Sequence, residues 1–208
     1  MVSPDARSRK TAAQLRPRAW GGASEEEART YMQERLNLYA KTMFWSFVVL
    51  MAFLGGAYRV LSIPVNNTEL VFGGAAVLLA IMAALWRVVL VRGTPSVERM
   101  YRLDALFATA IGLSFGASAS LQSNLQAAAY TSLIFASFTV FTRALLVPSS
   151  ARRTAIVGSI TFVPVVAAGI YLGFAFKQEL PAAAYVGGGI MFCVLAVVIA
   201  TNGSKIIY

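Results

Sequence analysis

The sequence predicts an all-α protein, a polytopic membrane helical bundle of about six transmembrane helices with both ends in the cytoplasm. Of its 208 residues, 58% are hydrophobic and only 13% are charged, whereas soluble domains average about 25% charged residues. The apolar residues also fall in runs of about 20, the helix length that crosses about 30 Å of hydrocarbon. Such continuous runs exclude a membrane β-barrel, whose strands alternate apolar and polar residues over about 10 positions.

Two polar segments precede the first apolar run. Residues 1–23 are rich in Arg and predict a disordered basic cytoplasmic tail, although an organelle presequence stays open because Asp5 is the only acid there. Residues 24–42 predict a juxtamembrane amphipathic helix, since Ser24 and the three glutamates after it resemble a helix N-cap followed by acids at the positive end of the helix dipole. This helix either lies at the headgroups or continues into the first span.

The transmembrane domain is predicted to cover residues 43–201. Its six expected spans, in chain order, are 43–61, 70–90, 103–121, 128–147, 154–176 and 182–200. Short polar or basic segments separate them, which makes three helical hairpins. The third and fourth spans contain more Ser, so five crossings remain an alternative. Residues 202–208 are expected to form a cytoplasmic exit segment.

The distribution of Lys and Arg predicts the orientation. Eight lie within the first 42 residues, four more between Arg87 and Arg102, and three around Pro148, whereas the opposite side has only Arg59 and Lys177. Short loops rich in Lys and Arg stay in the cytoplasm. We therefore expect a multi-pass protein of the cell inner membrane of a bacterium, with both termini inside.

Three charged residues lie within or next to the expected spans, at their cytoplasmic ends. They are Arg87, Asp104 and Arg143. A charge in hydrocarbon is costly unless it is paired or reaches water. Asp104 is thus a candidate for an interhelix ion pair with Arg87 or Arg143. The alternative is that both arginines extend to the lipid headgroups.

Small residues recur at every fourth position in the third span, the spacing that lets two helices approach closely. The predicted packing positions are Ala108, Gly112, Gly116 and Ser120, with Gly169 and Gly173 repeating the spacing in the fifth span. Pro164 should kink the fifth helix, because it removes one backbone hydrogen bond.

The residues offer little for chemistry. The chain has no His and a single Cys, Cys193, so the usual general base and metal ligands are missing, and we expect no cofactor and no metal. The net charge of +9 lies mostly near helix ends, where it indicates a lipid bilayer as partner and not a nucleic acid. No acid lies at the centre of a span, which disfavours a coupled transporter.

Two short stretches carry a resemblance to a known family. They are Tyr-Met-Gln-Glu-Arg-Leu-Asn-Leu-Tyr-Ala-Lys-Thr-Met-Phe-Trp at 31–45 and Ser-Lys-Ile-Ile-Tyr at 204–208. Both are similar to the entry and exit of the N-terminal multi-pass membrane module of bacterial eukaryotic-like serine/threonine protein kinases. The resemblance implies a cytoplasmic kinase domain as partner. None of the kinase motifs occurs in this chain, so no kinase residue can be transferred and the chain itself is not expected to be an enzyme.

Three functions follow in order of preference. The first is a membrane sensor or anchor module of a bacterial signalling protein, which relays membrane or ligand state to a cytoplasmic domain, with homo-oligomerisation left open. The second is a small channel, facilitator or transporter-like protein. Its expected polar lining is Ser114, Ser118, Ser120, Gln122 and Asn124. The third is a membrane enzyme, for which only Glu98 and Asp104 lie near each other.

Overall fold

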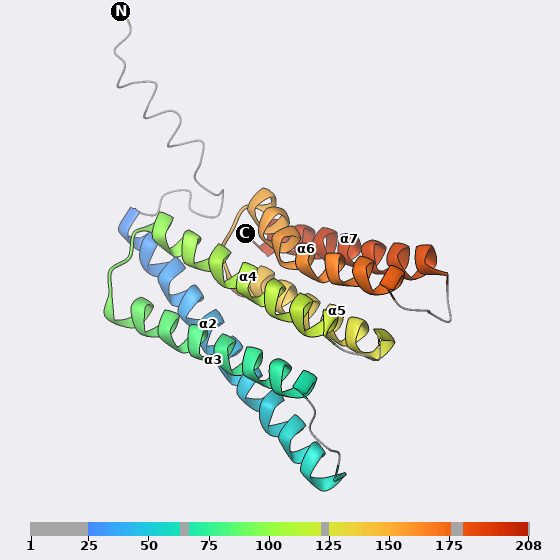
Figure 1. Ribbon diagram of the computed structural model, residues 1–208. Helices are drawn as coiled ribbons and strands as arrows, with labels where there is room; N and C mark the ends of the chain where they lie inside the picture. The colour runs from blue at the N-terminus through green and yellow to red at the C-terminus, as the bar shows by residue number, and fades with distance from the viewer. Residues whose placement is uncertain (1–24, 63–66, 122–124, 176–180, 208) are drawn as a thin grey trace, which may run out of the picture.

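The computed structural model describes residues 25–62, 67–121, 125–175 and 181–207, and within them it is all helical (Figure 1). The predicted basic tail, residues 1–23, lies outside the described residues. The helices are α2 (Glu25–Val60), α3 (Asn67–Arg92), α4 (Val97–Ser120), α5 (Leu125–Leu146), α6 (Ala151–Ala175) and α7 (Ala182–Ile207). The predicted all-α fold class is confirmed.

Three helices differ in extent from the expected spans. The expected juxtamembrane helix and first span are one continuous helix, α2, whose 36 residues measure about 54 Å. Helix α4 begins at Val97, six residues before the expected start, because the Ser96 side chain accepts a hydrogen bond from the Arg99 backbone amide (3.3 Å) and caps the helix. Helix α7 continues through most of the expected exit segment and ends at Ile207.

Among the described residues, five helices are long and apolar enough to cross a membrane. The spans are Glu26–Val60, Gly73–Arg92, Val97–Ser120, Ala151–Ala175 and Ala182–Ile207. Helix α5 contributes a shorter apolar segment from the described residues, Thr131–Leu146. The whole of α5 has 22 residues, about 33 Å of helix, and this length matches the hydrocarbon thickness.

Consecutive helices run in opposite directions, as interhelix contacts near both of their ends demonstrate. Gln33 near the start of α2 bonds to carbonyl groups at the end of α3, while Met51 further along α2 lies beside Gly73 in the first part of α3. In the second hairpin, Asp104 near the start of α4 meets Arg143 near the end of α5, while Phe115 stacks on Phe135 further along. The start of α2 and the end of α7 therefore lie at the same end of the bundle, which we call the terminal end (Figure 1).

Helix α4 is the centre of the bundle and packs against α2, α3, α5 and α6. Its closest approach is to α6, where two glycines face backbone. A Cβ atom on Gly112 would collide with the Thr161 carbonyl oxygen, and one on Gly116 would lie 2.6 Å from the Pro164 carbonyl oxygen. Only glycine allows the two helices to lie this close.

The outer surface of the bundle is apolar. Large side chains such as Phe53, Leu85, Val163, Phe174 and Met191 are more than half exposed and come from four different helices. A protein in water rarely exposes apolar surface on this scale. Together with the length of the helices, this surface identifies a membrane protein, which agrees with the expected class.

Candidate functional site

The strongest candidate for a functional site is a buried ion pair between α4 and α5. Arg143 Nε lies 2.9 Å from Asp104 Oδ1 and 3.0 Å from Oδ2, and Arg143 Nη2 lies 2.5 Å from Oδ2. The two residues are only 3% and 1% exposed. Removing two charges from water is costly, and it is offset here by a bidentate geometry in which both carboxylate oxygens accept hydrogen bonds.

An aromatic cluster separates this ion pair from the α2–α3 side of the bundle. Tyr39 of α2 packs edge-on against Trp86 of α3 at 5.8 Å and against Phe107 of α4 at 6.2 Å, measured between ring centroids. Trp86 and Phe107 lie 5.1 Å apart. The three rings are almost fully buried. Asp104 lies one helical turn before Phe107, so α2 and α3 pack against the same part of α4 that holds the ion pair.

A third charged group approaches the site from α6. The Arg153 guanidinium carbon lies 3.2 Å from the centroid of the Tyr101 ring, an arrangement that cation–π attraction favours. Tyr101 and Asp104 are three residues apart and hence on one side of α4. Arg153 Nε is buried and has no hydrogen-bond partner among the described residues. Helices α4, α5 and α6 therefore each place at least one charged side chain at the terminal end, and α4 adds the Tyr101 ring.

Three buried hydroxyl groups hold the last turn of α7 at this end. Ser149 Oγ donates to Thr154 Oγ1 (2.7 Å), Thr154 Oγ1 donates to Ser204 Oγ (3.0 Å), and Ser204 Oγ donates back to the Ser149 carbonyl oxygen (2.9 Å). All three residues are at most 2% exposed. We call them the hydroxyl ring. It joins the end of α7 to the connection between α5 and α6.

The start of α2 is held in a comparable way by Gln33. Its side-chain amide Nε2 donates to the Leu90 carbonyl oxygen and to the Gly93 carbonyl oxygen, the latter at 2.9 Å. These are carbonyl groups at the end of α3, which have no partner within the helix. Both outer helices of the chain are thus joined to their neighbours at the terminal end through side-chain hydrogen bonds to backbone.

The structure brings together some of the residues that the sequence singled out. Asp104 pairs with Arg143, whereas Arg87 is exposed on α3. Among the packing positions, Ala108, Gly112 and Gly116 are buried, and the Ser120 hydroxyl donates to the Ala117 carbonyl oxygen of its own helix. In α6, Gly173 packs near Val186 of α7, whereas Gly169 has open space around it. Pro164 lies inside α6, with its carbonyl against Gly116.

Sequence reasoning missed the aromatic cluster, Gln33 and the hydroxyl ring. Ser204 lies 50 residues after Thr154 in the chain, and single hydroxyl residues near span ends are too common to indicate a contact. Tyr39 and Trp86 gave no signal either, because aromatic residues near membrane interfaces are ordinary. Gln33 gave no clear signal either, because its neighbours one turn away on α2 include Arg29, Thr30 and Asn37, which are polar as well.

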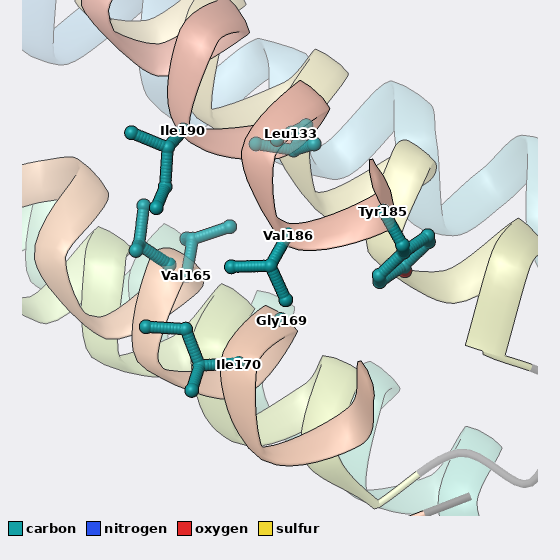
Figure 2. Close-up of a pocket in the computed structure, with 9 residues that line it drawn as sticks. Leu133, Val165, Gly169, Ile170, Tyr185, Val186 and Ile190 are labelled. Carbon is teal, nitrogen blue, oxygen red and sulfur yellow. The ribbon is translucent and has the colours of Figure 1, made fainter. Parts of the chain in front are cut away.

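The expected channel lining is closed within one chain. Ser118 is 2% exposed, and together with Ser114 it faces Phe47, Ala76 and Leu79, with no volume left for a water molecule. Gln122 and Asn124 lie outside the described residues. A small cavity of about 30 Å³ lies further along between α5, α6 and α7, lined by apolar side chains such as Val165 and Val186 (Figure 2). A cavity of this kind stays dry and offers no path for ions.

Comparison with known proteins adds no relative. No protein-family model, no curated protein and no solved structure matches this chain. In the part of the chain that the structure describes, no group of three or more His, Cys, Asp or Glu side chains could hold a metal ion. The function therefore has to be inferred from the geometry of the terminal end.

Proposed function

We propose that this chain is a membrane sensor or anchor module of a bacterial signalling protein, which passes the state of the membrane or of a lipid-soluble ligand to a cytoplasmic domain. The observation that carries the proposal is the position of α2 and α7. Both reach the terminal end of the bundle. Helix α2 is held there by the partly buried hydrogen bonds from Gln33 to α3, and α7 by the buried hydrogen bond from Ser204 to the α5–α6 connection. A domain joined to either helix would be displaced when the helices of the bundle move relative to one another.

The positive residues support an orientation with the terminal end in the cytoplasm. Arg92, Arg99, Arg102 and Arg152 all lie at this end of their helices, and short loops rich in Lys and Arg are retained in the cytoplasm. In the proposed arrangement the protein lies in the inner membrane, and a kinase domain is the partner implied by the resemblance of residues 31–45 and 204–208. The role requires no catalytic residue in this chain.

The Asp104–Arg143 pair is the proposed switch point. A bidentate buried pair has one favourable geometry, and helices that carry it cannot slide by a small amount without losing hydrogen bonds. Bilayer thickness acts on the same helices, because a change in thickness alters their preferred tilt. A thickness change that separates α4 from α5 would therefore act on the aromatic cluster, and through it on α2.

The test is the distance between the two outer helices at the terminal end. Spin labels are placed on Glu34→Cys in α2 and Lys205→Cys in α7, in the Cys193→Ala background, and the distance distribution is measured by electron spin resonance in bilayers of increasing thickness. We expect the distribution to shift with thickness, and to shift in Asp104→Asn at constant thickness. Ser204→Ala should broaden the distribution, because it removes the hydroxyl ring.

Arg87→Gln is the matched control, since it removes a cationic residue of α3 that is exposed and should leave the distribution unchanged. A distribution that is the same in every bilayer and in Asp104→Asn would contradict a sensor. The module would then be an anchor at most.

A further inference from the structure

A lateral groove of about 790 Å³ lies between α2 and α5, outside the site described above. It opens to the outer surface of the bundle. Its lining residues are Leu38, Lys41, Thr42, Trp45, Ser46, Val49, Leu50 and Phe53 of α2, with Ile134, Phe135 and Phe138 of α5. Its volume lies in the range of about 300–1,000 Å³ that is usual for small-molecule sites.

The divergence of the helices explains why this groove exists. Figure 1 shows the α2–α3 hairpin moving away from α6 and α7 toward the Val60 end of α2. The groove side of α2 is left with large apolar groups that no helix of this chain covers, and Trp45 and Phe53 are 54% and 71% exposed. In a membrane this surface is in contact with lipid chains.

The groove is polar at one end only. Lys41 is exposed and takes part in none of the ion pairs among the described residues. The nearest acid before it on the same helix, Glu34, lies about 10 Å away along the axis. The Ser46 hydroxyl is a second donor close by, whereas the Thr42 hydroxyl already donates to the Leu38 carbonyl oxygen. From Val49 onward the lining is entirely apolar.

The length of the groove matches one leaflet of the bilayer. Lys41 and Phe53 are twelve residues apart, about 18 Å of helix, and half of the hydrocarbon core is about 15 Å. Trp45 lies one turn from Lys41, and Trp is enriched at the level of the headgroups. The charged end of the groove therefore belongs at the interface, and the apolar end reaches the middle of the membrane.

From this geometry we propose that the groove binds an anionic phospholipid of the surrounding leaflet, with its phosphate on Lys41 and an acyl chain along α2 and α5. Charge complementarity selects the headgroup, since a basic residue at the membrane surface attracts anionic lipid. The apolar walls hold the chain. A zwitterionic lipid fills the same walls but carries no net negative charge for Lys41.

A second groove provides the matched internal control. It lies between α2 and α3, has a volume of about 430 Å³, and is lined only by apolar residues, among them Met51, Ala80, Leu85 and Val88. None of its lining residues is charged. The bundle therefore holds one groove whose lining includes a cation and one whose lining does not.

The test uses Trp45 as a reporter of the lipid in the groove. The full-length chain carrying Trp20→Phe and Trp86→Phe is placed in bilayers in which either phosphatidylglycerol or phosphatidylcholine has brominated acyl chains, which quench Trp fluorescence. We expect stronger quenching of Trp45 by brominated phosphatidylglycerol at equal mole fraction. Lys41→Gln should lower this relative affinity about fivefold, and Lys41→Arg should keep it.

For the control, Trp45→Phe and Leu85→Trp are added to the same background, so that the reporter lies in the α2–α3 groove. Quenching there should be equal for the two lipids. Equal quenching at Trp45, or a preference that survives Lys41→Gln, would overturn the proposal. Weak quenching by both lipids together with a concentration-dependent dimer would also overturn it, because a second copy of the chain would then occupy the groove.

Discussion

At the scale of single residues, the most consequential interaction is the Asp104–Arg143 pair. Each residue is almost fully buried, and each satisfies the charge of the other. Removing one partner leaves an uncompensated charge, which is much more costly than never having had the pair. The pair therefore makes the bundle depend on both residues at once, although the pair itself adds little net stability compared with apolar residues of similar size.

The first prediction concerns the stability of single and double variants. Arg143→Met should lower the free energy of unfolding by about 3–5 kcal/mol, because Asp104 is left buried without a cation. The double variant with Asp104→Leu should regain most of this loss. The measurement is unfolding of the detergent-solubilised protein monitored by circular dichroism.

Arg102→Gln serves as the control for this series. It breaks an ion pair with Glu98 in which both side chains are about three-quarters exposed, so the loss should stay below about 1 kcal/mol. If Arg143→Met were no more harmful than Arg102→Gln, the buried pair would not be a structural requirement.

At the scale of the elements, the contact between α4 and α6 sets how the two halves of the chain meet. The approach depends on Gly112 and Gly116, which face the backbone of α6 near Thr161 and Pro164. These backbone atoms cannot move without shifting the helix. A side chain added here would act on the spacing of two helices and not merely on local packing.

The second prediction compares glycines of the same small-residue pattern. Gly116→Ala should destabilise the protein by about 1–3 kcal/mol, the usual cost of forcing extra atoms into a packed core. Gly169→Ala should be neutral or slightly stabilising, because its Cβ would enter open space and Ala favours helix. Thermal unfolding of both variants in the same detergent is the measurement, and equal melting temperatures would contradict the close approach.

At the scale of the whole molecule, the alternating directions of the helices determine which loops share a side of the membrane. In the part of the chain that the structure describes, five helices meet the length and hydropathy needed to cross. Helix α5 decides between five crossings and six, and its contacts with α4 extend from Ser132 to Arg143, about half of its length. A helix packed in this way lies parallel to the spanning helices, so we expect α5 to cross.

The third prediction follows from this topology. Single cysteines at Gly93, Leu121 and Ser150, each in the Cys193→Ala background, are treated with a membrane-impermeant thiol reagent in intact cells. Six crossings with cytoplasmic termini expose Leu121→Cys alone. Labelling of both Leu121→Cys and Ser150→Cys would mean that α5 does not cross, and that the end of α7 lies outside the cell.

Much of the architecture could be read from the chain because hydrophobic runs determine it locally. A helix in hydrocarbon satisfies its own backbone, so a run of about 20 apolar residues is already a structural element. The helices extend beyond the expected spans mainly where polar residues adjoin an apolar run. Thus the expected juxtamembrane helix is part of α2, which begins at Glu25, and α7 reaches Ile207, since a helix does not have to end where its apolar run ends.

Of the buried ion pair, the sequence identified the acid but not which arginine pairs with it. The cost of a lone charge in a membrane selects Asp104 as a residue that needs a cation, but its partner among Arg87 and Arg143 depends on how α4 rotates between α3 and α5. Only the tertiary structure decided that Arg143 pairs and Arg87 faces outward. Likewise, glycine spacing indicated a close approach of α4 without indicating that α6 was the neighbour.

What the sequence by itself determined is therefore the fold class and the approximate spans, which depend on properties of consecutive residues. The tertiary structure alone decided the hydroxyl ring, the aromatic cluster and the α2–α5 groove, because each combines residues from distant parts of the chain. Their contacts arise from the rotation and divergence of whole helices. The rotation and divergence of the helices depend on many packing interactions together, so they cannot be inferred from any single stretch of sequence.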